Sequence, residues 1–67
     1  MLRLRIESIL KEQGHSKYWL FKQMDMSYQN LNRIITNQTS SIRFDILERI
    51  SDLLKVTVGD IFEKIDE

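Results

Sequence analysis

The chain has 67 residues and no net charge, because ten Lys and Arg residues balance ten Asp and Glu residues, and it contains no cysteine and no proline. This length fits a single domain, which we place over residues 1–67. The lack of cysteine excludes disulfides and thiolate metal sites and favours a reducing, cytoplasmic setting. No apolar run approaches the roughly 18 residues that a membrane span needs, so we expect no membrane association.

The charges are divided unevenly along the chain. Residues 1–43 carry seven Lys and Arg against three Asp and Glu, whereas residues 44–67 carry three against seven. Local field, more than net charge, attracts phosphate groups. We therefore expect residues 1–43 to face a polyanion, although mixed surface charge is also ordinary for a small domain.

The first predicted element is a helix over residues 3–13, after a start at residues 2–4 that is compatible with extended backbone. Its apolar positions recur at helical spacing: Ile6, Ile9 and Leu10. Gly14 can end the helix in the left-handed conformation. We interpret His15, the only histidine, as a turn residue before the Ser16 cap, at a position from which an apolar side chain often packs against Leu20, because neither metal ligands nor a nucleophile accompanies it.

Residues 16–37 predict two short helices joined by a tight turn, which is the helix-turn-helix unit. Ser16 and Ser27 each stand directly before a periodic segment, where a hydroxyl can accept a hydrogen bond from an amide of the first helical turn. We therefore expect helices over residues 17–24 and 28–36, joined by a turn at residues 25–27. The side chains expected to face the core follow helical spacing: Leu20, Phe21, Met24, Leu31, Ile34 and Ile35.

The second helix of this unit is expected to present four side chains outward: Tyr28, Gln29, Asn32 and Arg33. Side chains of these types can reach the edges of bases in a DNA major groove, although a solvated helix face would carry the same pattern. Asn37 follows as a residue that tolerates the left-handed conformation. The polar residues 38–41 then form a loop whose hydroxyls and amides suit phosphate contacts or simply water.

Two further helices complete the prediction. Residues 44–55 form the longer one, with an apolar stripe at Phe44, Leu47, Ile50, Leu53 and Leu54. Thr57 and Asp60 form a capping box that opens a short fifth helix, in which Ile61 closes the core. Phe62 and Ile65 add more apolar surface than the last turn of a short helix needs for packing onto the core. We therefore assign these two residues to a dimer interface. The chain is thus predicted to be all-α.

Five segments, in this order and spacing, resemble the lambda-repressor/Cro-like (Xre-type) helix-turn-helix DNA-binding domain family over nearly the whole chain. They are LRIESILKEQG, SKYWLFKQMDMS, LNRIITN, IRFDILERISDLL and VTVGDIFE. The resemblance implies a five-helix, lambda-repressor-like bundle with the helix-turn-helix at its second and third helices. It also implies a phage-like transcriptional repressor or regulator that binds a double-stranded DNA operator as a homodimer. Such a protein works in the cytoplasm of a prokaryotic cell, at the nucleoid when it is bound to DNA.

Carried over residue by residue, the resemblance implies two sets of DNA contacts. The base contacts are Tyr28, Gln29, Asn32 and Arg33, in a recognition helix over residues 28–36. The phosphate contacts are Lys17, Ser27, Thr39, Ser40, Ser41 and Arg43. No cofactor, metal ion or small-molecule substrate is expected.

Three residues depart from the family pattern. Lys17 replaces the usual Gln at a phosphate contact, and Asp25 stands where a Gly usually makes the turn. Phe21 stands where a small Ala usually lies between the two helices. We expect Asp25 to keep the turn by taking a left-handed conformation. The ring of Phe21 must push the helices apart or rotate outward, which would change the angle at which the second helix meets DNA.

An alternative function is a protein-interaction module on the same scaffold, antitoxin-like or a regulator's partner, that does not bind DNA. The zero net charge, the acidic last third and the aromatic residues Trp19, Phe21 and Phe62 favour it. Trp19 either folds over the edge of the core, which we favour, or is an exposed anchor for a partner protein. An enzyme is a poor fit, because the sequence specifies no nucleophile, base and orienting group together.

Overall fold

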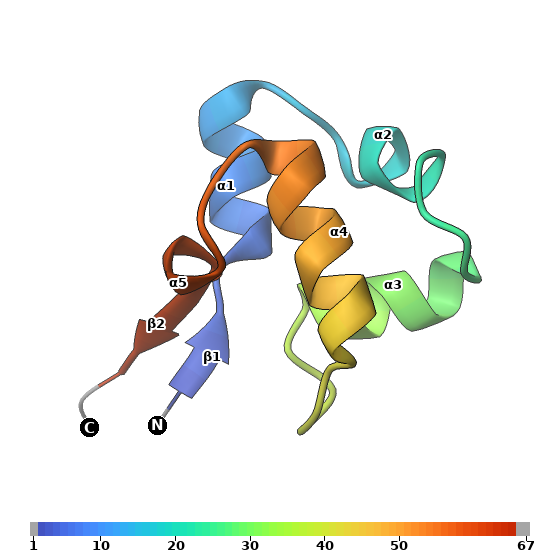
Figure 1. Cartoon of the computed structure of the whole chain (residues 1–67). Coiled ribbons are helices and arrows are strands. Elements are labelled where there is room, and N and C mark those ends of the chain that lie inside the picture. The colour runs from blue at the N-terminus through green and yellow to red at the C-terminus, as the bar shows by residue number, and fades with distance from the viewer. Residues whose placement is uncertain (1, 66–67) are drawn as a thin grey trace.

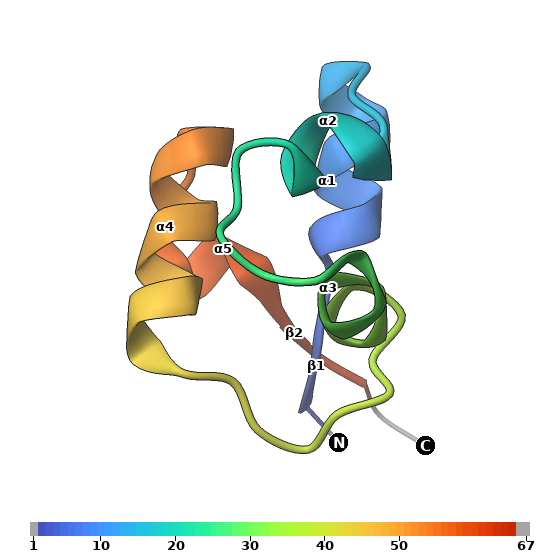
Figure 2. The same cartoon turned by 90° about the vertical axis from the view of Figure 1, so that its right-hand side faces the viewer.

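The computed structural model describes residues 2–65 of the chain. Five helices and two short strands follow one another as β1 (Leu2–Leu4), α1 (Ile6–Gln13), α2 (Lys17–Phe21), α3 (Tyr28–Ile35), α4 (Phe44–Leu54), α5 (Val58–Ile61) and β2 (Phe62–Lys64) (Figure 1). The helices surround a common core, and α3 lies below α2 in both views (Figures 1 and 2). The described chain is therefore mostly helical and has the five helices that the sequence predicts.

Apolar side chains at helical spacing form a single core. They come from β1, from each helix and from the link after α2: Leu4, Ile6, Ile9, Leu10, Leu20, Met24, Leu31, Ile34, Ile35, Leu47, Ile50, Leu54 and Ile61. Burying one such side chain contributes about 1.5–3 kcal/mol. The spacing of these residues therefore decides which face of each helix turns inward.

Polar caps fix where several helices begin and end. Ser16 and Ser27 each accept a hydrogen bond from the backbone N–H three residues later, at 3.0 and 3.2 Å. Thr57 and Asp60 form the predicted capping box of α5. Gly14 ends α1 with φ of 74°, a conformation that is free of strain in a residue without Cβ. These predicted boundaries are confirmed.

The all-α prediction missed a two-stranded antiparallel sheet. β1 pairs with β2 in a register that sets Leu2 opposite Lys64, and the side chains of Arg3 and Glu63 form an ion pair at 2.9 Å. α1 consequently begins at Ile6 and not at residue 3. The paired strands stand at the two ends of the chain, so the spacing of residues within 2–13 could not reveal their pairing.

α2 is shorter than predicted, and its link to α3 is longer. α2 ends at Phe21, and the amides of Gln23 and Met24 then donate to carbonyl oxygens three residues earlier, at 3.1 and 3.0 Å. This is the tighter 3₁₀ pattern. Asp25 is not among the residues with positive φ, so the expected left-handed turn at this position is wrong. The link over residues 22–27 is long enough for the chain to turn without a left-handed residue.

α4 confirms most of the predicted apolar stripe but not its first member. Leu47, Ile50 and Leu54 are buried and Leu53 is partly buried, whereas Phe44 is 87% exposed. Phe44 is the first residue of α4, and helical side chains lean toward the N-terminus of their helix. Its ring therefore extends beyond the end of the core and does not pack onto it.

Candidate nucleic-acid interface

α3 has one apolar face and one polar face. Leu31, Ile34 and Ile35 are buried against the core. The four side chains predicted to contact bases lie on the other face, because their positions i, i+1, i+4 and i+5 fall together in a helix of 3.6 residues per turn. Tyr28, Gln29 and Arg33 are exposed, and Asn32 is partly buried.

Lys17 brings the start of α2 against this polar face. Its Nζ donates a hydrogen bond to Oδ1 of Asn32 at 3.4 Å. The contact joins one predicted phosphate-contact residue to one predicted base-contact residue across the two helices. Since the distance is near the upper limit for a hydrogen bond, a phosphate oxygen can replace Asn32 as the acceptor.

Arg33 and Arg43 meet at a hollow between α3, the loop after it and the start of α4. The hollow has a volume of about 280 Å³, and we call it the arginine hollow; the rest of its lining is Met26, Asn30, Ile34, Thr39, Ser41, Ile42 and Ile46. Nε of Arg43 lies 3.2 Å from Oδ1 of Asp45, in an ion pair whose two side chains are both exposed. Exposed ion pairs contribute little stability. Arg43 can therefore exchange Asp45 for an anionic ligand at small cost.

The loop before α4 is ordered by its own side chains. Oγ1 of Thr39 donates to the carbonyl oxygen of Ser41 at 2.8 Å and accepts from the Ser41 amide at 3.4 Å. Thr39 is partly buried, whereas Ser40 and Ser41 are exposed. The remaining residue of the predicted phosphate set, Ser27, is exposed at the N-terminus of α3, where its hydroxyl caps the helix. The structure thus places the predicted phosphate residues around both ends of α3.

Phe21 lies where α2 approaches the start of α3. It is partly buried, and its ring meets Tyr28 edge-on, with centroids 5.2 Å apart and planes at 79°. Tyr18 continues the aromatic row, 6.1 Å from Phe21. The ring that replaces the expected small residue therefore supports Tyr28, one of the predicted base-contact residues.

His15 lies in the turn before α2 as predicted, but its partner is Trp19 and not Leu20. The two rings stack at 3.7 Å between centroids and 5° between planes. Leu20 itself is fully buried in the core. Trp19 is partly buried against the core, which confirms that it covers the edge of the core.

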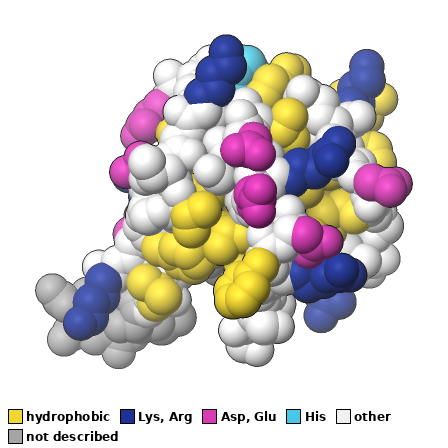
Figure 3. Space-filling view, viewed as in Figure 1, with side chains coloured by type: hydrophobic (Ala, Val, Ile, Leu, Met, Phe, Trp, Pro, Cys, Tyr) yellow, Lys and Arg dark blue, Asp and Glu magenta, His cyan; other side chains and the backbone are white. Residues whose placement is uncertain are grey.

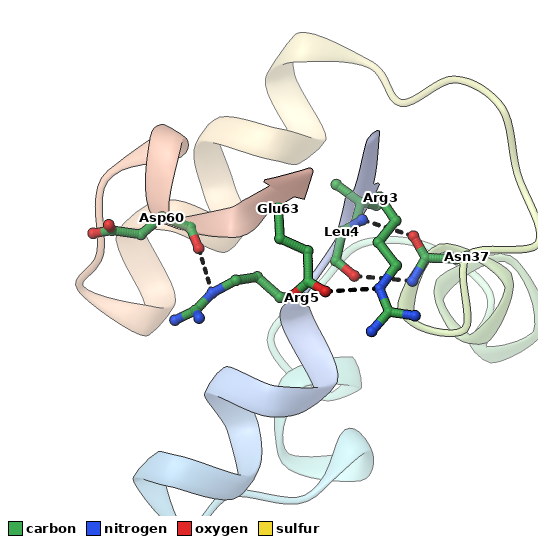
Figure 4. A network of polar contacts seen from close by, with 6 residues as sticks. All are labelled: Arg3, Leu4, Arg5, Asn37, Asp60 and Glu63. Carbon is green, nitrogen blue, oxygen red and sulfur yellow. Dashed lines mark hydrogen bonds and ion pairs between the residues drawn. The ribbon is translucent and has the colours of Figure 1, made fainter. Parts of the chain in front are cut away.

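Asn37 is a residue whose main role sequence reasoning missed. Its left-handed conformation was predicted and is observed, with φ of 61°. Its side-chain amide also pairs with both backbone polar groups of Leu4: Oδ1 accepts from the Leu4 amide at 2.7 Å, and Nδ2 donates to the Leu4 carbonyl oxygen at 2.9 Å (Figure 4). Asn37 therefore ties the exit of α3 to β1, and no local pattern signals a contact across 33 residues.

The same region also joins β1 and the residue before α1 to α5 and β2. Nε of Arg3 donates to Glu63 at 2.9 Å, and Nε of Arg5 donates to the carbonyl oxygen of Asp60 at 2.7 Å (Figure 4). These arginines thus hold the C-terminal segment. They contribute to the basic N-terminal composition, but their observed contacts lie within the chain.

The predicted dimer residues, Phe62 and Ile65, are both partly buried within the chain. Phe62 lies in β2 opposite Leu4 and packs against the core. Part of the apolar surface that we assigned to a second chain is thus covered by this one, because the sheet turns Phe62 back onto the core.

The outer face of α4 is acidic. Asp25, Asp45, Glu48 and Asp52 line a second hollow, of about 470 Å³, together with Arg49. Figure 3 shows Asp and Glu side chains gathered over α4 on this face. Carboxylates repel phosphates, so this side of the molecule is the one least suited to a nucleic acid.

These features define a small helix-turn-helix domain. Its polar face lies on α3, which is the second helix of the helix-turn-helix unit. A family model of the Cro/C1-type HTH DNA-binding domain matches residues 5–67, so the chain belongs to the Cro/C1-type helix-turn-helix DNA-binding family. A crystal structure described as "a putative DNA-binding protein from Bacteroides fragilis" is similar, with a TM-score of 0.83 and 27% sequence identity over 94% of this chain and 100% of that one.

No curated protein matches the sequence. Among residues 2–65, no helix has the length and apolar character that crossing a membrane requires.

Proposed function

We propose that this domain binds double-stranded DNA in a sequence-specific manner, with α3 in the major groove, as a transcriptional repressor or regulator of phage or mobile-element type. The observation that carries the proposal is the polar face of α3, flanked by Lys17 on α2 and by Arg43 at the start of α4. A recognition helix between two cations matches the chemistry of a groove between two phosphate backbones.

In this proposal the face of α3 reads bases. Gln29 and Asn32 can each pair with adenine through two hydrogen bonds, and Arg33 can pair with guanine in the same way. Each such pair is worth about 1–3 kcal/mol of discrimination against the wrong base. Tyr28, held by Phe21, packs on a thymine methyl group or contacts the backbone.

The residues around α3 fix the domain on the DNA backbone. Lys17 and Arg43 supply charge, and the amides at the N-terminus of α3, next to Ser27, supply donors. The loop between α3 and α4 adds further phosphate contacts through the hydroxyl groups of Thr39, Ser40 and Ser41. Because one such domain makes few contacts, we propose that it binds a two-fold operator as a homodimer, with Phe62 and Ile65 contributing to the interface.

The first test is fluorescence anisotropy of the domain with a pool of random duplex DNA at two salt concentrations. Affinity should fall steeply with salt, with a slope of about −0.9 for each phosphate contact. Selection from the same pool would then give the preferred site. Failure to bind at low salt and high protein concentration would contradict the proposal.

Single substitutions test the assigned roles. Arg33→Ala should cost about 1–3 kcal/mol, mainly on the selected site, whereas Lys17→Ala should weaken all duplexes equally and lower the salt slope by about one. Lys55→Gln is the matched control, because it removes an exposed charge at the far end of α4. Equal loss on all sequences from Arg33→Ala would remove its base-reading role.

A protein-interaction module, antitoxin-like or a regulator's partner, is the second candidate. Tyr18 is 60% exposed beside Phe21, and Nζ of Lys22 lies 5.6 Å from the centre of the Tyr18 ring. Exposed aromatic rings of this kind serve as anchors in protein interfaces. This candidate replaces the first if the anisotropy experiment detects no salt-dependent DNA binding.

A further inference from the structure

A row of three aromatic rings crosses from α2 to the start of α3. Its members are Tyr18, Phe21 and Tyr28, with ring centroids 6.1 Å apart for the first two and 5.2 Å apart for the last two. Tyr18 is 60% exposed and Tyr28 is 44% exposed, whereas Phe21 between them is partly buried. The proposed function gives a role to Tyr28 and to the ring that holds it, but none to Tyr18.

Two contacts set α2 alongside the polar face of α3. Nζ of Lys17, the first residue of α2, lies 3.4 Å from Oδ1 of Asn32. The ring of Phe21, the last residue of α2, meets the ring of Tyr28. The two residues on α2 are four apart, as are the two on α3, so each pair lies on one face of its own helix. Both ends of α2 therefore border the face that we propose to enter the major groove.

Tyr18 and Lys22 form the next row of side chains on α2, and we call them the outer pair. Each follows a residue of the contact row by one position, which is a rotation of about 100° around the helix. The Lys22 amide donates to the Tyr18 carbonyl oxygen at 3.0 Å, so helical geometry continues to Lys22. Nζ of Lys22 lies over the Tyr18 ring, 5.6 Å from its centre, within the range of a cation–π interaction. Both side chains are exposed, so the outer pair lies at the edge of the contact between the two helices.

The charge of Lys22 is not neutralised by a carboxylate. None of the ion pairs formed within residues 2–65 involves Lys22 or Lys17. A π face attracts an ammonium group but leaves its charge in place. The two lysines are five residues apart, about 7.5 Å along the helix axis, and one strand of DNA carries a phosphate for about every 3.4 Å of its own axis. Two phosphates of one strand therefore lie within reach of the two long side chains.

We propose that Lys22 binds a phosphate of the DNA backbone beside the one that Lys17 binds, and that the Tyr18 ring positions Lys22 for this contact. The inference deepens the proposed function and rests on it. With α3 in the major groove, α2 faces one of the two backbones that border the groove, and the arginine hollow faces the other. Tyr18 is a positioning residue in this proposal, because a lysine held over a ring loses less freedom when it binds.

The chemistry of the outer pair favours a polyanion over an apolar pocket of a partner protein. An aromatic anchor in a protein interface buries its ring in a desolvated pocket. Here an ammonium group lies over the ring of Tyr18, so burial of the ring would also remove that charge from water, which is costly. A phosphate oxygen instead accepts hydrogen bonds from the ammonium group and keeps it paired.

Fluorescence anisotropy with the selected duplex at several salt concentrations tests the contact made by Lys22. Lys22→Gln should lower the salt slope by about one and the affinity by about five- to tenfold at 0.1 M salt, since one phosphate contact is lost. The loss should be equal on all duplexes, because a phosphate carries no sequence information. Lys55→Gln is the matched control, since it removes an exposed charge at the far end of α4 and should leave slope and affinity unchanged.

Two substitutions of Tyr18 test its positioning role. Tyr18→Ser removes the ring and should lower affinity about two- to fivefold, whereas Tyr18→Phe keeps the ring and should bind like the native chain. Added to Lys22→Gln, the change Tyr18→Ser should cost nothing further, because no ammonium group is left for the ring to hold. Without DNA, the ring should shift the proton resonances of the Lys22 methylene next to Nζ, and only Tyr18→Ser should abolish that shift.

The outcomes separate this inference from the proposed function. A native chain that does not bind duplex DNA would contradict both. A native chain that binds, with a Lys22→Gln variant of unchanged slope, would overturn only the contact made by Lys22. Equal losses from Tyr18→Phe and Tyr18→Ser would overturn the positioning role. Both residues of the outer pair are exposed, so thermal unfolding of the variants should match the native chain and show that they fold.

Discussion

Asn37→Ala should destabilise the domain by about 2–4 kcal/mol. The side chain makes two hydrogen bonds to the backbone of Leu4, at 2.7 and 2.9 Å, in a partly buried place. Each contributes about 0.5–1.5 kcal/mol net. Alanine would also have to adopt φ of 61°, which adds about 1 kcal/mol because of its Cβ.

Asn37→Gly separates the two contributions. Glycine adopts the left-handed conformation freely, so this variant should lose only the hydrogen bonds, about 1–3 kcal/mol. The measurement is urea unfolding followed by far-ultraviolet circular dichroism, with the slopes compared among variants. An Asn37→Gly domain as stable as the native chain would refute the role assigned to the two hydrogen bonds.

Three other substitutions should have effects of known sign. Lys55→Gly should stabilise the domain by about 0.5–1 kcal/mol, because Lys55 ends α4 in the left-handed conformation with φ of 57°; a loss in the same urea assay would contradict this. Thr57→Ala should cost about 1 kcal/mol through loss of the α5 capping box, and an unchanged unfolding midpoint would contradict that role. Phe21→Ala should lower DNA affinity, because the Tyr28 ring would lose the contact that holds it. Unchanged affinity in the anisotropy assay would show that this ring contact does not position Tyr28 for DNA.

Features that depend on residues three or four apart were predictable from the sequence. The hydroxyl caps at Ser16 and Ser27 and the capping box at Thr57 each join groups within one helical turn. The polar face of α3 was predictable for the same reason. Once Leu31 and Ile34 turn toward the core, the helical repeat leaves the opposite face outside.

Features that depend on distant residues were not predictable. The β1–β2 sheet and the pairing of Asn37 with Leu4 join segments with no common local pattern. The exposure of Phe44 was missed because the spacing of α4 extends the apolar stripe to its first residue, while the core itself ends one turn later. For the site, the contact between Lys17 and Asn32 required the packing angle of two helices.

The pairing of Leu2 with Lys64 also determines how the chain can be reconnected. Since β1 and β2 lie side by side, a short linker can join them, and new ends can be opened in the exposed loop between α3 and α4 (Figure 1). The permuted chain would run from α4 through α5, the sheet, α1 and α2 to α3. Its last helix would then be α3, the helix that we propose to face DNA, and that helix could be exchanged for another without altering the order of the rest.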